Sequence, residues 1–217
     1  MYRKQSWLTY VNVFALVLGM CSLASAQLAS RPAEEWSKTL EQPSRTEGLK
    51  IPEIVARLGL KPGQVVADLG AGTGLFSTPM AKAVAPSGKV YAVEIDKGFI
   101  PMIESKAKEA RLSNVKPVLG EFNDPKLPVQ DVDLAFMHDV LHHVQDRATY
   151  LKNAVRYVKG GGRFVIIDFK ADQSPHRDQP SLIVSEEQAT GWMKAAGFNK
   201  VEKVDLFPDK YFLVFSR

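Results

Sequence analysis

Three glycines separated by single residues stand out in the segment VADLGAGTGLF, residues 66–76. Asp68 precedes Gly70, Gly72 and Gly74, and an apolar run precedes Asp68. Glycine lets a ligand approach the backbone because no Cβ stands in the way. A loop between a strand and a helix places its backbone N–H groups at the carboxyl edge of the sheet, where open α/β folds bind ligands. The segment therefore predicts a binding site for a nucleotide-like ligand.

Two features narrow the class of ligand. Asp68 can accept hydrogen bonds from the loop N–H groups and lie near a cationic ligand. Glu94 ends the next apolar run, at about the place where dinucleotide-binding folds carry an acidic residue for the ribose hydroxyls. The nicotinamide fingerprint, however, needs its third glycine one position later, where this chain has Leu75. The pattern favours another ribose-containing cofactor; a tight turn that merely requires glycine is the alternative.

Imidazole and carboxylate side chains gather after the later predicted strands. They comprise all four histidines of the chain and two aspartates: His138, His142, His143, His176, Asp139 and Asp168. Because imidazole changes its charge near neutral pH, it can serve as a general base, and we select His138, His142 and Asp168 as candidate catalytic residues. Two alternatives stay open: a divalent metal site formed by His138, Asp139 and Asp168, or imidazoles that only cap and pack locally. We expect no bound metal.

The elements that must position these residues alternate along the chain. Continuous Val/Ile-rich runs between helices are what a parallel sheet covered on both faces requires. A glycine run is predicted to end the fourth of the expected helices. Strands are predicted over residues 64–69, 90–95, 115–119, 132–137 and 163–167, helices over 51–58, 75–84, 99–111 and 147–158, and the glycine run at 160–162.

The end of the chain departs from this alternation. Residues 185–188 form a capping-box pattern that opens a helix ending near Gly197. Two strand-like runs follow, at residues 200–206 and 211–215, and the turn 208–210 joins them. Strands with so short a link must be antiparallel neighbours. The predicted fold is therefore an α/β, doubly wound, Rossmann-like sheet, mostly parallel with an antiparallel C-terminal strand and helices on both faces.

The first residues have the pattern of a secretory signal peptide. Arg3 and Lys4 form a positive start, an apolar stretch follows, and the small residues 24–26 form a cleavage site before Gln27. We therefore expect residues 1–26 to be a signal peptide and the protein to be exported to the periplasm or outside the cell. An uncleaved N-terminal membrane anchor is the alternative, and it would be the chain's only contact with a membrane.

Composition sets further bounds on the rest of the chain. The 217 residues are 45% hydrophobic and 24% charged, which is typical of a folded domain. The formal net charge of +4 falls to +2 without residues 1–26, and no basic run carries interleaved aromatic residues, which disfavours nucleic acid as a partner. Cys21 is the only cysteine, so the cleaved protein would have no disulfide or thiol nucleophile. Residues 27–50 are predicted to be an irregular or partly helical arm, and residues 51–217 the domain.

The ordered set of motifs resembles a known family. Residues 66–74 look like the first motif of class I S-adenosylmethionine-dependent methyltransferases. The resemblance covers residues 45–217 and implies a seven-stranded sheet whose last strand is antiparallel. It is closest to a group of exported bacterial methyltransferases of unassigned substrate, which the arm with Trp36 and Arg45 and the ending 207–212 resemble. The further motifs lie, in order, at residues 90–96, 120–122, 133–144, 157–163 and 196–198.

The resemblance implies S-adenosylmethionine as the cofactor and a role for each candidate residue. Glu94 stands where the family more often has Asp, which keeps the bidentate carboxylate, and Gly160 where it more often has Pro. The implied contacts are Asp68, Gly70, Gly72 and Gly74 to the methionine and sulfonium end, Glu94 to the ribose hydroxyls, Ile95 to the adenine face, Glu121 or Phe122 to the adenine edge, and Met137 and His138 beside the transferred methyl group.

The implied reaction is transfer of a methyl group to a small-molecule or lipid-like acceptor by in-line displacement. A sulfonium methyl is already electrophilic, so the protein's main task is to position a nucleophile. The arm up to residue 50 and the loop 170–184 are predicted to select the acceptor. Two alternatives remain: an inactive S-adenosylmethionine-binding module, and a nicotinamide-dependent oxidoreductase, which Leu75 and the terminal hairpin disfavour.

Overall fold

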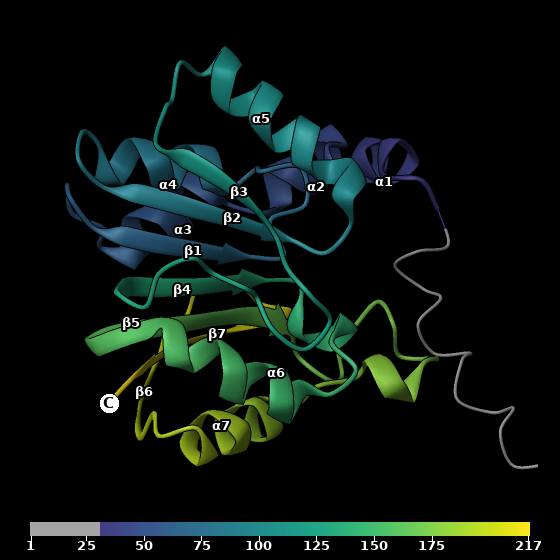
Figure 1. Cartoon of the computed structure of the whole chain (residues 1–217). Coiled ribbons are helices and arrows are strands. Elements are labelled where there is room, and N and C mark those ends of the chain that lie inside the picture. Colours follow the sequence, from purple (N-terminus) through teal and green to yellow (C-terminus); the bar gives the residue numbers. More distant parts are fainter. Residues whose placement is uncertain (1–30) are drawn as a thin grey trace, which may run out of the picture. The chain divides into compact units, whose positions relative to one another are not determined.

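A computed structural model describes residues 31–217. The expected signal peptide or anchor, residues 1–26, and the first residues of the arm lie outside the described residues. The described part contains the expected seven-stranded sheet, and its strand order is β3-β2-β1-β4-β5-β7-β6 (Figure 1). The strands are β1 (Val65–Leu69), β2 (Lys89–Glu94), β3 (Val115–Leu119), β4 (Val132–His138), β5 (Val158–Phe169), β6 (Lys200–Lys203) and β7 (Lys210–Ser216).

Strand directions follow the predicted pattern. The neighbouring pairs among β1 to β5 are parallel, whereas β7 is antiparallel to both β5 and β6. The C-terminal hairpin thus joins the sheet through β7, its second strand. The carboxyl ends of the parallel strands point to the right in Figure 1, where the loops after β4 and β5 also lie.

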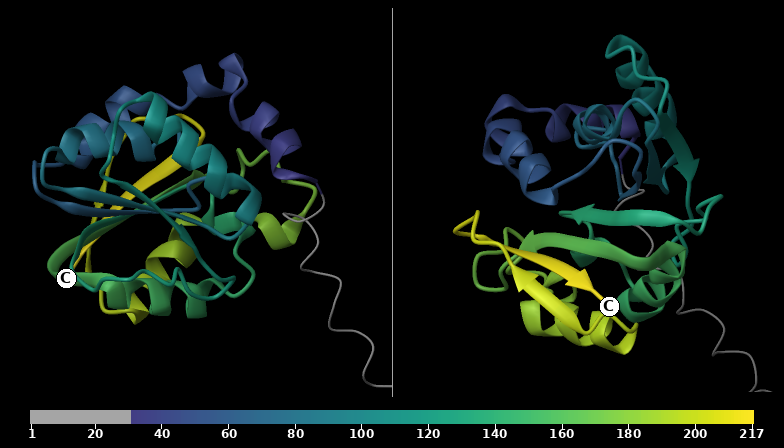
Figure 2. Two further views of the ribbon diagram at one scale, coloured as in Figure 1. Left: turned by 45° about the horizontal axis from the view of Figure 1, so that its top comes forward. Right: turned by 90° about the vertical axis from the view of Figure 1, so that its left-hand side faces the viewer.

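Helices cover both faces of the sheet, as Figure 2 shows from two further sides. Among the helices on one face, α3, α4 and α5 pack directly on the strands, while α6 and α7 cover the other face. The arm forms two short helices, α1 and α2, in agreement with a partly helical prediction. The bounds are α1 (Ala33–Leu40), α2 (Pro43–Gly48), α3 (Ile51–Leu58), α4 (Ser77–Val84), α5 (Ile100–Glu109), α6 (Arg147–Ala154) and α7 (Glu186–Ala195).

Alternate residues of the central strands enter two separate hydrophobic cores. In β4, Leu134 and Phe136 belong to the core under α3, α4 and α5, whereas Ala135 and Met137 belong to the core under α6 and α7. Successive side chains of a strand point to opposite faces, so a strand buried on both faces must be apolar throughout. This requirement explains the continuous Val/Ile-rich runs in the sequence.

Strand β5 is longer than predicted. The glycine run 160–162 was expected to end a helix, but these residues lie within the strand. Helix α6 ends earlier, at Ala154, and one 3-10 turn over residues 155–157 leads into β5. The pairing of β4 with β5 is irregular between Val132 and Leu134, because residue 133 of β4 lies opposite residues 159–162 of β5. Gly161, within this irregular stretch, has φ +76°, a conformation that glycine adopts without strain.

The predicted capping box opens α7. The Ser185 hydroxyl accepts a hydrogen bond from the Gln188 N–H at 3.2 Å, and the Gln188 side-chain oxygen accepts one from the Ser185 N–H at 2.9 Å. Such a cap stabilises a helix by about 1 kcal/mol. Within residues 31–217, no helix combines the length and apolar character that crossing a bilayer requires.

Candidate functional site

The glycine loop joins β1 to α4 at the carboxyl edge of the sheet. Gly70, Gly72 and Gly74 all have positive φ, at +76°, +54° and +83°, which other residues adopt only with strain. A Cβ on Gly70 would lie 2.5 Å from a methyl carbon of Val140. The N–H groups of Gly70 and Ala71 both donate to the Val93 carbonyl at 2.9 Å. The loop is therefore held between the end of β2 and the segment after β4.

Asp68 is buried beneath this loop. Its carboxylate accepts a hydrogen bond from the Ser77 hydroxyl at 2.5 Å, a donor from α4 that the sequence pattern did not indicate. Burial raises the pKa of Asp68 to about 7, and the nearby charge of Glu94 adds to the increase. A cation bound beside Asp68 would stabilise its charged form. This environment suits the ammonium and sulfonium end of the expected cofactor.

Glu94 closes the loop from the β2 side. One of its carboxylate oxygens accepts a hydrogen bond from the Gly72 N–H at 2.9 Å, and the other accepts from Ile95 and Asp96 at 2.8 and 3.3 Å. Burial raises the pKa of Glu94, and these three N–H groups oppose the increase. The carboxylate is thus held in one orientation at the end of β2, where the contact with a ribose was expected.

The residues expected around the adenine lie at the ends of β2 and β3. The Gly120 N–H donates to the Glu94 carbonyl at 2.9 Å, which keeps the two strand ends together. Ile95 is half-buried, whereas the Phe122 side chain is 63% exposed. Glu121 is exposed too, and forms an ion pair with Lys126 at 3.3 Å. The exposed ring of Phe122 is free to pack against a planar base.

Met137 and His138 lie at the end of β4, but their side chains point to opposite faces. Met137 is fully buried in the core under α6 and α7. His138 lies on the other face, with ring centroids 4.8 Å from Phe76 and 6.4 Å from Phe207. The structure therefore does not bring these two side chains together. Only His138 faces the side of the sheet that carries these aromatic rings.

His138 has an unusual environment for a histidine. Its Nε2 atom is buried and has no hydrogen-bond partner among residues 31–217, and its Nδ1 atom lies 3.4 Å from a carboxylate oxygen of Asp139. Burial lowers the pKa of His138 to about 4, although the charge of Asp139 opposes this. The imidazole is therefore neutral at pH 7. A neutral ring with a free nitrogen can accept a hydrogen bond or a proton from a bound molecule.

Asp139 connects His138 to two basic residues from distant parts of the chain. Lys210, at the start of β7, donates to one carboxylate oxygen, and Arg45 of the arm lies 3.8 Å from the other. Burial raises the pKa of Asp139, but His138, Lys210 and Arg45 together hold it below its ordinary value. Asp139 itself has φ +56°. This acidic residue therefore stays charged and fixes the end of β4.

His142 and Asp168 form a tight pair. The His142 Nδ1 atom lies 2.6 Å from the Asp168 Oδ1 atom, and the His142 backbone N–H donates to Oδ2 at 3.0 Å. The Phe169 N–H also donates to Asp168. Both side chains are almost fully buried. The structure thus brings together two of the three predicted catalytic residues, while His138 lies apart among phenylalanine rings.

Within residues 31–217, the alternative metal set of His138, Asp139 and Asp168 does not form a cluster of possible ligands. Instead, His142 lies beside His143 and His176, with ring centroids 4.0 and 5.1 Å away. Burial lowers the pKa of His143 to about 4, and the pKa of His176 is also lowered, first by burial. This grouping of three imidazoles was not predicted from the sequence, because residues 143 and 176 are far apart in the chain.

The arm lies over the glycine loop. A Cβ on Gly72 would lie 3.2 Å from a methyl carbon of Leu40, at the end of α1. Arg45 donates to the Leu40 carbonyl at 2.9 Å, and Lys106 of α5 forms an ion pair with Glu41 at 2.6 Å. These contacts hold the α1–α2 segment against the binding loop and beside Asp139.

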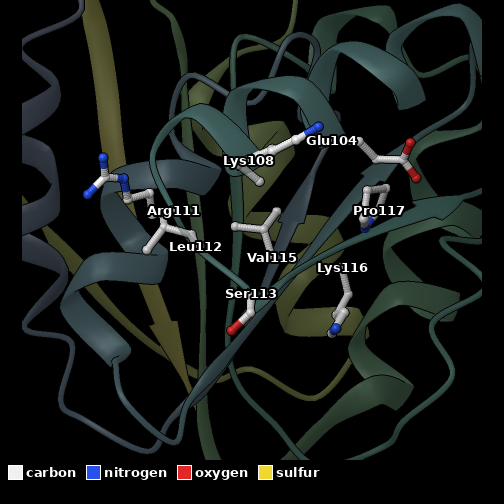
Figure 3. A pocket seen from close by; sticks show the side chains of 9 residues that line it. Glu104, Lys108, Arg111, Leu112, Ser113, Val115, Lys116 and Pro117 are labelled. Atoms are coloured by element: carbon white, nitrogen blue, oxygen red, sulfur yellow. The ribbon is translucent and has the colours of Figure 1, made fainter.

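A separate pocket of about 590 Å³ lies between α5 and β3 (Figure 3). Lys108 and Arg111 line it from the helix side, and Val115 and Pro117 from the strand. Val115 and Pro117 lie in the first three residues of β3, whereas the glycine loop follows the carboxyl end of β1. The pocket is therefore not part of the site described above.

The fold and the site together define a class of protein. An antiparallel hairpin completes the parallel sheet, a glycine loop follows the first strand, and an acidic residue ends the second strand. This is the arrangement of class I S-adenosylmethionine-dependent methyltransferases. A family model described as a methyltransferase domain matches residues 60–204, which is more than half of the chain. The chain belongs to this family.

Relatives agree with this assignment. A demethylmenaquinone methyltransferase of Geobacillus sp. (strain WCH70) is 31% identical over 131 residues, 60% of this chain and 53% of the relative. A ubiquinone/menaquinone biosynthesis C-methyltransferase of Vibrio vulnificus is 28% identical over 112 residues, 51% of this chain and 43% of the relative. The chain thus spans about half the length of these curated relatives.

A solved structure extends the agreement over most of the chain. The crystal structure of an S-adenosylmethionine-dependent methyltransferase from Aquifex aeolicus superposes with a TM-score of 0.75 at 27% identity, and covers 83% of this chain and 96% of that one. The protein is accordingly a class I S-adenosylmethionine-dependent methyltransferase, and S-adenosylmethionine is its cofactor. The oriented Glu94 carboxylate and the left-handed glycine loop, which carries no side chains at residues 70, 72 and 74, fit that cofactor.

Proposed function

We propose that the protein methylates a small, quinone-like or lipid-like acceptor by in-line displacement. The observation that carries this proposal is the environment of His138, a neutral imidazole with a free, buried Nε2 atom at the end of β4. The buried rings of Phe76 and Phe207 beside it make the surroundings of this nitrogen apolar, as a quinone-like or lipid-like acceptor requires. Two of the relatives described above are named as quinone-pathway methyltransferases, which supports an acceptor of this class.

Each residue of the site has a distinct task in this proposal. The cofactor supplies an electrophilic methyl group. Asp68 and Glu94 hold its charged end and its ribose, and the glycine loop admits it close to the backbone. His138 accepts a hydrogen bond from an acceptor hydroxyl at Nε2, holds it in line and takes its proton. Positioning of this kind can contribute up to ~7–11 kcal/mol to a barrier reduction.

Binding and turnover are tested separately. We expect the purified chain to bind S-adenosylhomocysteine in a calorimetric titration, and we expect Glu94→Gln to weaken binding by roughly 10- to 100-fold because a charged hydrogen-bond acceptor is lost. Glu104→Gln is a matched control, since Glu104 lines the separate pocket beside α5. Binding of a nicotinamide dinucleotide in preference to S-adenosylhomocysteine would contradict the proposal.

Turnover is measured as S-adenosylhomocysteine formation with three acceptor classes: reduced demethylated quinones, simple phenols and phosphoethanolamine. The proposal expects the reduced quinones or phenols to be methylated and phosphoethanolamine not to be. Methylation of phosphoethanolamine alone would overturn the acceptor class. Cofactor binding without turnover of any acceptor would favour the inactive binding module.

We also propose that residues 1–26 direct export of the protein. The support is the sequence alone: a positive start at Arg3 and Lys4, an apolar stretch and small residues at 24–26. Amino-terminal sequencing of protein from fractionated cells tests the proposal, with Gln27 expected as the first residue. A cytoplasmic protein that starts at Met1 would contradict it, and a membrane-bound protein that keeps residues 1–26 would indicate the anchor.

A further inference from the structure

Three histidines converge beside the loop that follows β5. His142 and His143 lie in a 3-10 turn after β4, and His176 lies in the loop before the 3-10 turn of residues 180–182. One ring nitrogen from each lies within 4.8 Å of the others. Three nitrogens bound to one tetrahedral ion are about 3.3 Å apart, as bond lengths of about 2.0–2.1 Å require. Binding of an ion would therefore draw the three nitrogens closer together.

Asp168 orients the first of these rings. Its carboxylate accepts hydrogen bonds from the backbone N–H groups of His142 and Phe169, at 3.0 and 2.8 Å, so it acts as an acceptor toward the ring as well. His142 must then donate its Nδ1–H at 2.6 Å, which leaves Nε2 as the lone-pair nitrogen. Metal-binding histidines usually donate their other ring nitrogen to a carboxylate in this way.

The loop that carries His176 is itself held in place. The His176 N–H donates to the Ser174 hydroxyl at 3.1 Å, and the His176 carbonyl accepts from the Gln179 N–H at 2.8 Å. His143 and His176 are partly exposed, whereas His142 is buried. The group therefore has one fixed, buried ligand and two at the surface, which provides a path for an ion from solvent.

We infer that His142, His143 and His176 bind one divalent transition-metal ion of the zinc type. Imidazole nitrogen suits Zn²⁺, Cu²⁺, Ni²⁺ and iron, whereas Mg²⁺ and Ca²⁺ prefer the oxygen ligands that this group lacks. Three protein ligands leave the fourth tetrahedral position open, as in catalytic zinc sites. The site goes beyond the proposed methyl transfer and differs from the sequence expectation of no metal.

The site also involves a loop with an expected role in acceptor choice. His176 belongs to the loop 170–184, which is predicted from the sequence to select the acceptor, and Asp168 is the last but one residue of β5, the strand beside β4. An ion held there would have its open position available to an oxygen or sulfur atom of a second molecule. Metal binding itself does not depend on methyl transfer, so the two proposals can fail independently.

Cobalt(II) titration of the full chain tests the inference. The protein must be purified without a histidine tag and stripped with a chelator, because its four histidines are the residues under test. Visible absorption is expected to rise to an end point at one Co²⁺ per chain, and stoichiometric Zn²⁺ is expected to displace it. Binding that does not saturate by one equivalent, or that needs millimolar metal, would overturn the inference.

Variants assign the ligands. Loss of a second-shell partner typically weakens metal binding 10- to 100-fold, so we expect about that loss for Asp168→Asn and a loss of roughly 100-fold or more for His143→Ala and His176→Ala. His138→Ala is the matched control, since His138 is the one histidine outside the group. It should keep the wild-type stoichiometry and affinity.

His176→Ala is the decisive variant, because its side chain lies in a surface loop and its loss should leave the fold intact. Circular dichroism and the melting temperature of the metal-free proteins check this. Equal metal affinity in wild type and His176→Ala, with both folded, would overturn the assignment. So would loss of binding in His138→Ala alone.

Discussion

His138 and His142 are four residues apart at the end of β4, yet their surroundings differ in almost every respect. His138 lies among phenylalanine rings, with one ring nitrogen unpartnered and its nearest carboxylate 3.4 Å away. His142 is held by Asp168 at 2.6 Å and lies beside two further imidazoles. The first environment leaves a nitrogen free for a bound molecule, while the second fixes a ring in one orientation.

The difference shows how neighbouring residues of one type acquire separate tasks. The segment between them contains Asp139, in a left-handed conformation, and Val140, which contacts the glycine loop at Gly70. The chain turns there, so His138 stays on one face of the sheet and His142 passes toward the loop after β5. Residues 139–141 thus separate the methyl-transfer side from the histidine group.

The largest expected effect is on stability, at His142. We expect His142→Phe to lower the free energy of unfolding by about 3–5 kcal/mol, because it leaves the buried Asp168 carboxylate without its ring partner. Chemical denaturation of the metal-free proteins measures this. A loss below about 1 kcal/mol would mean that the short contact contributes little, and the contrast with His138 would disappear.

The matching change at His138 should affect activity instead. We expect His138→Phe to lower kcat by roughly 10²–10³-fold, as loss of a proton-accepting group does, with the stability unchanged or increased. Stability should not fall because the substitution removes a buried nitrogen that has no partner. Turnover and denaturation are measured on the same preparation. Full activity in this variant would remove His138 from the proposed mechanism.

A substitution in the glycine loop can disturb the segment between His138 and His142. Gly70→Ala is expected to cost about 2–4 kcal/mol of stability, because its Cβ would lie 2.5 Å from Val140 and its φ is +76°. Gly160→Ala is the matched control, since its Cβ would have no neighbour within 4 Å. Equal melting temperatures for the two variants would show that Val140 moves aside without cost.

The smallest expected effect is a pH dependence that belongs to His138. Its pKa is lowered from 6.5 to about 4 in the folded protein, so the unfolded chain binds more protons between these values. Its contribution to stability is therefore present above pH 6.5 and is lost as the pH falls toward 4. Between pH 7 and pH 5 we expect wild type to lose about 2 kcal/mol more than His138→Phe. Parallel stability curves for the two proteins would contradict the lowered pKa.

Much of the fold follows from local patterns in the sequence. Continuous apolar runs, turn residues and the capping box at Ser185 each report on a few neighbouring positions, and the strands they predicted are present in the sheet. The prediction that the glycine run before Arg163 ends a helix was wrong. Glycine ends helices and also forms bulges, and only the pairing of β5 with β4 shows which applies here.

The candidate site was less accessible to the sequence. The motifs placed Asp68, Glu94 and His138 at strand ends. The partners of His142 and Asp139, however, come from far along the chain. Asp168 is 26 residues from His142, and Lys210 is 71 residues from Asp139. No local pattern reports such contacts, because the sheet order and the loop after β5 create them.

The contact between the arm and the glycine loop has a practical consequence. Leu40 lies against Gly72, and Arg45 reaches Asp139, although both precede the residues that the family model matches. A truncated protein that keeps only the matched domain would therefore expose the loop and lose a cation beside His138. The matched domain carries the glycine loop, and the residues before it cover that loop and place a basic side chain next to Asp139.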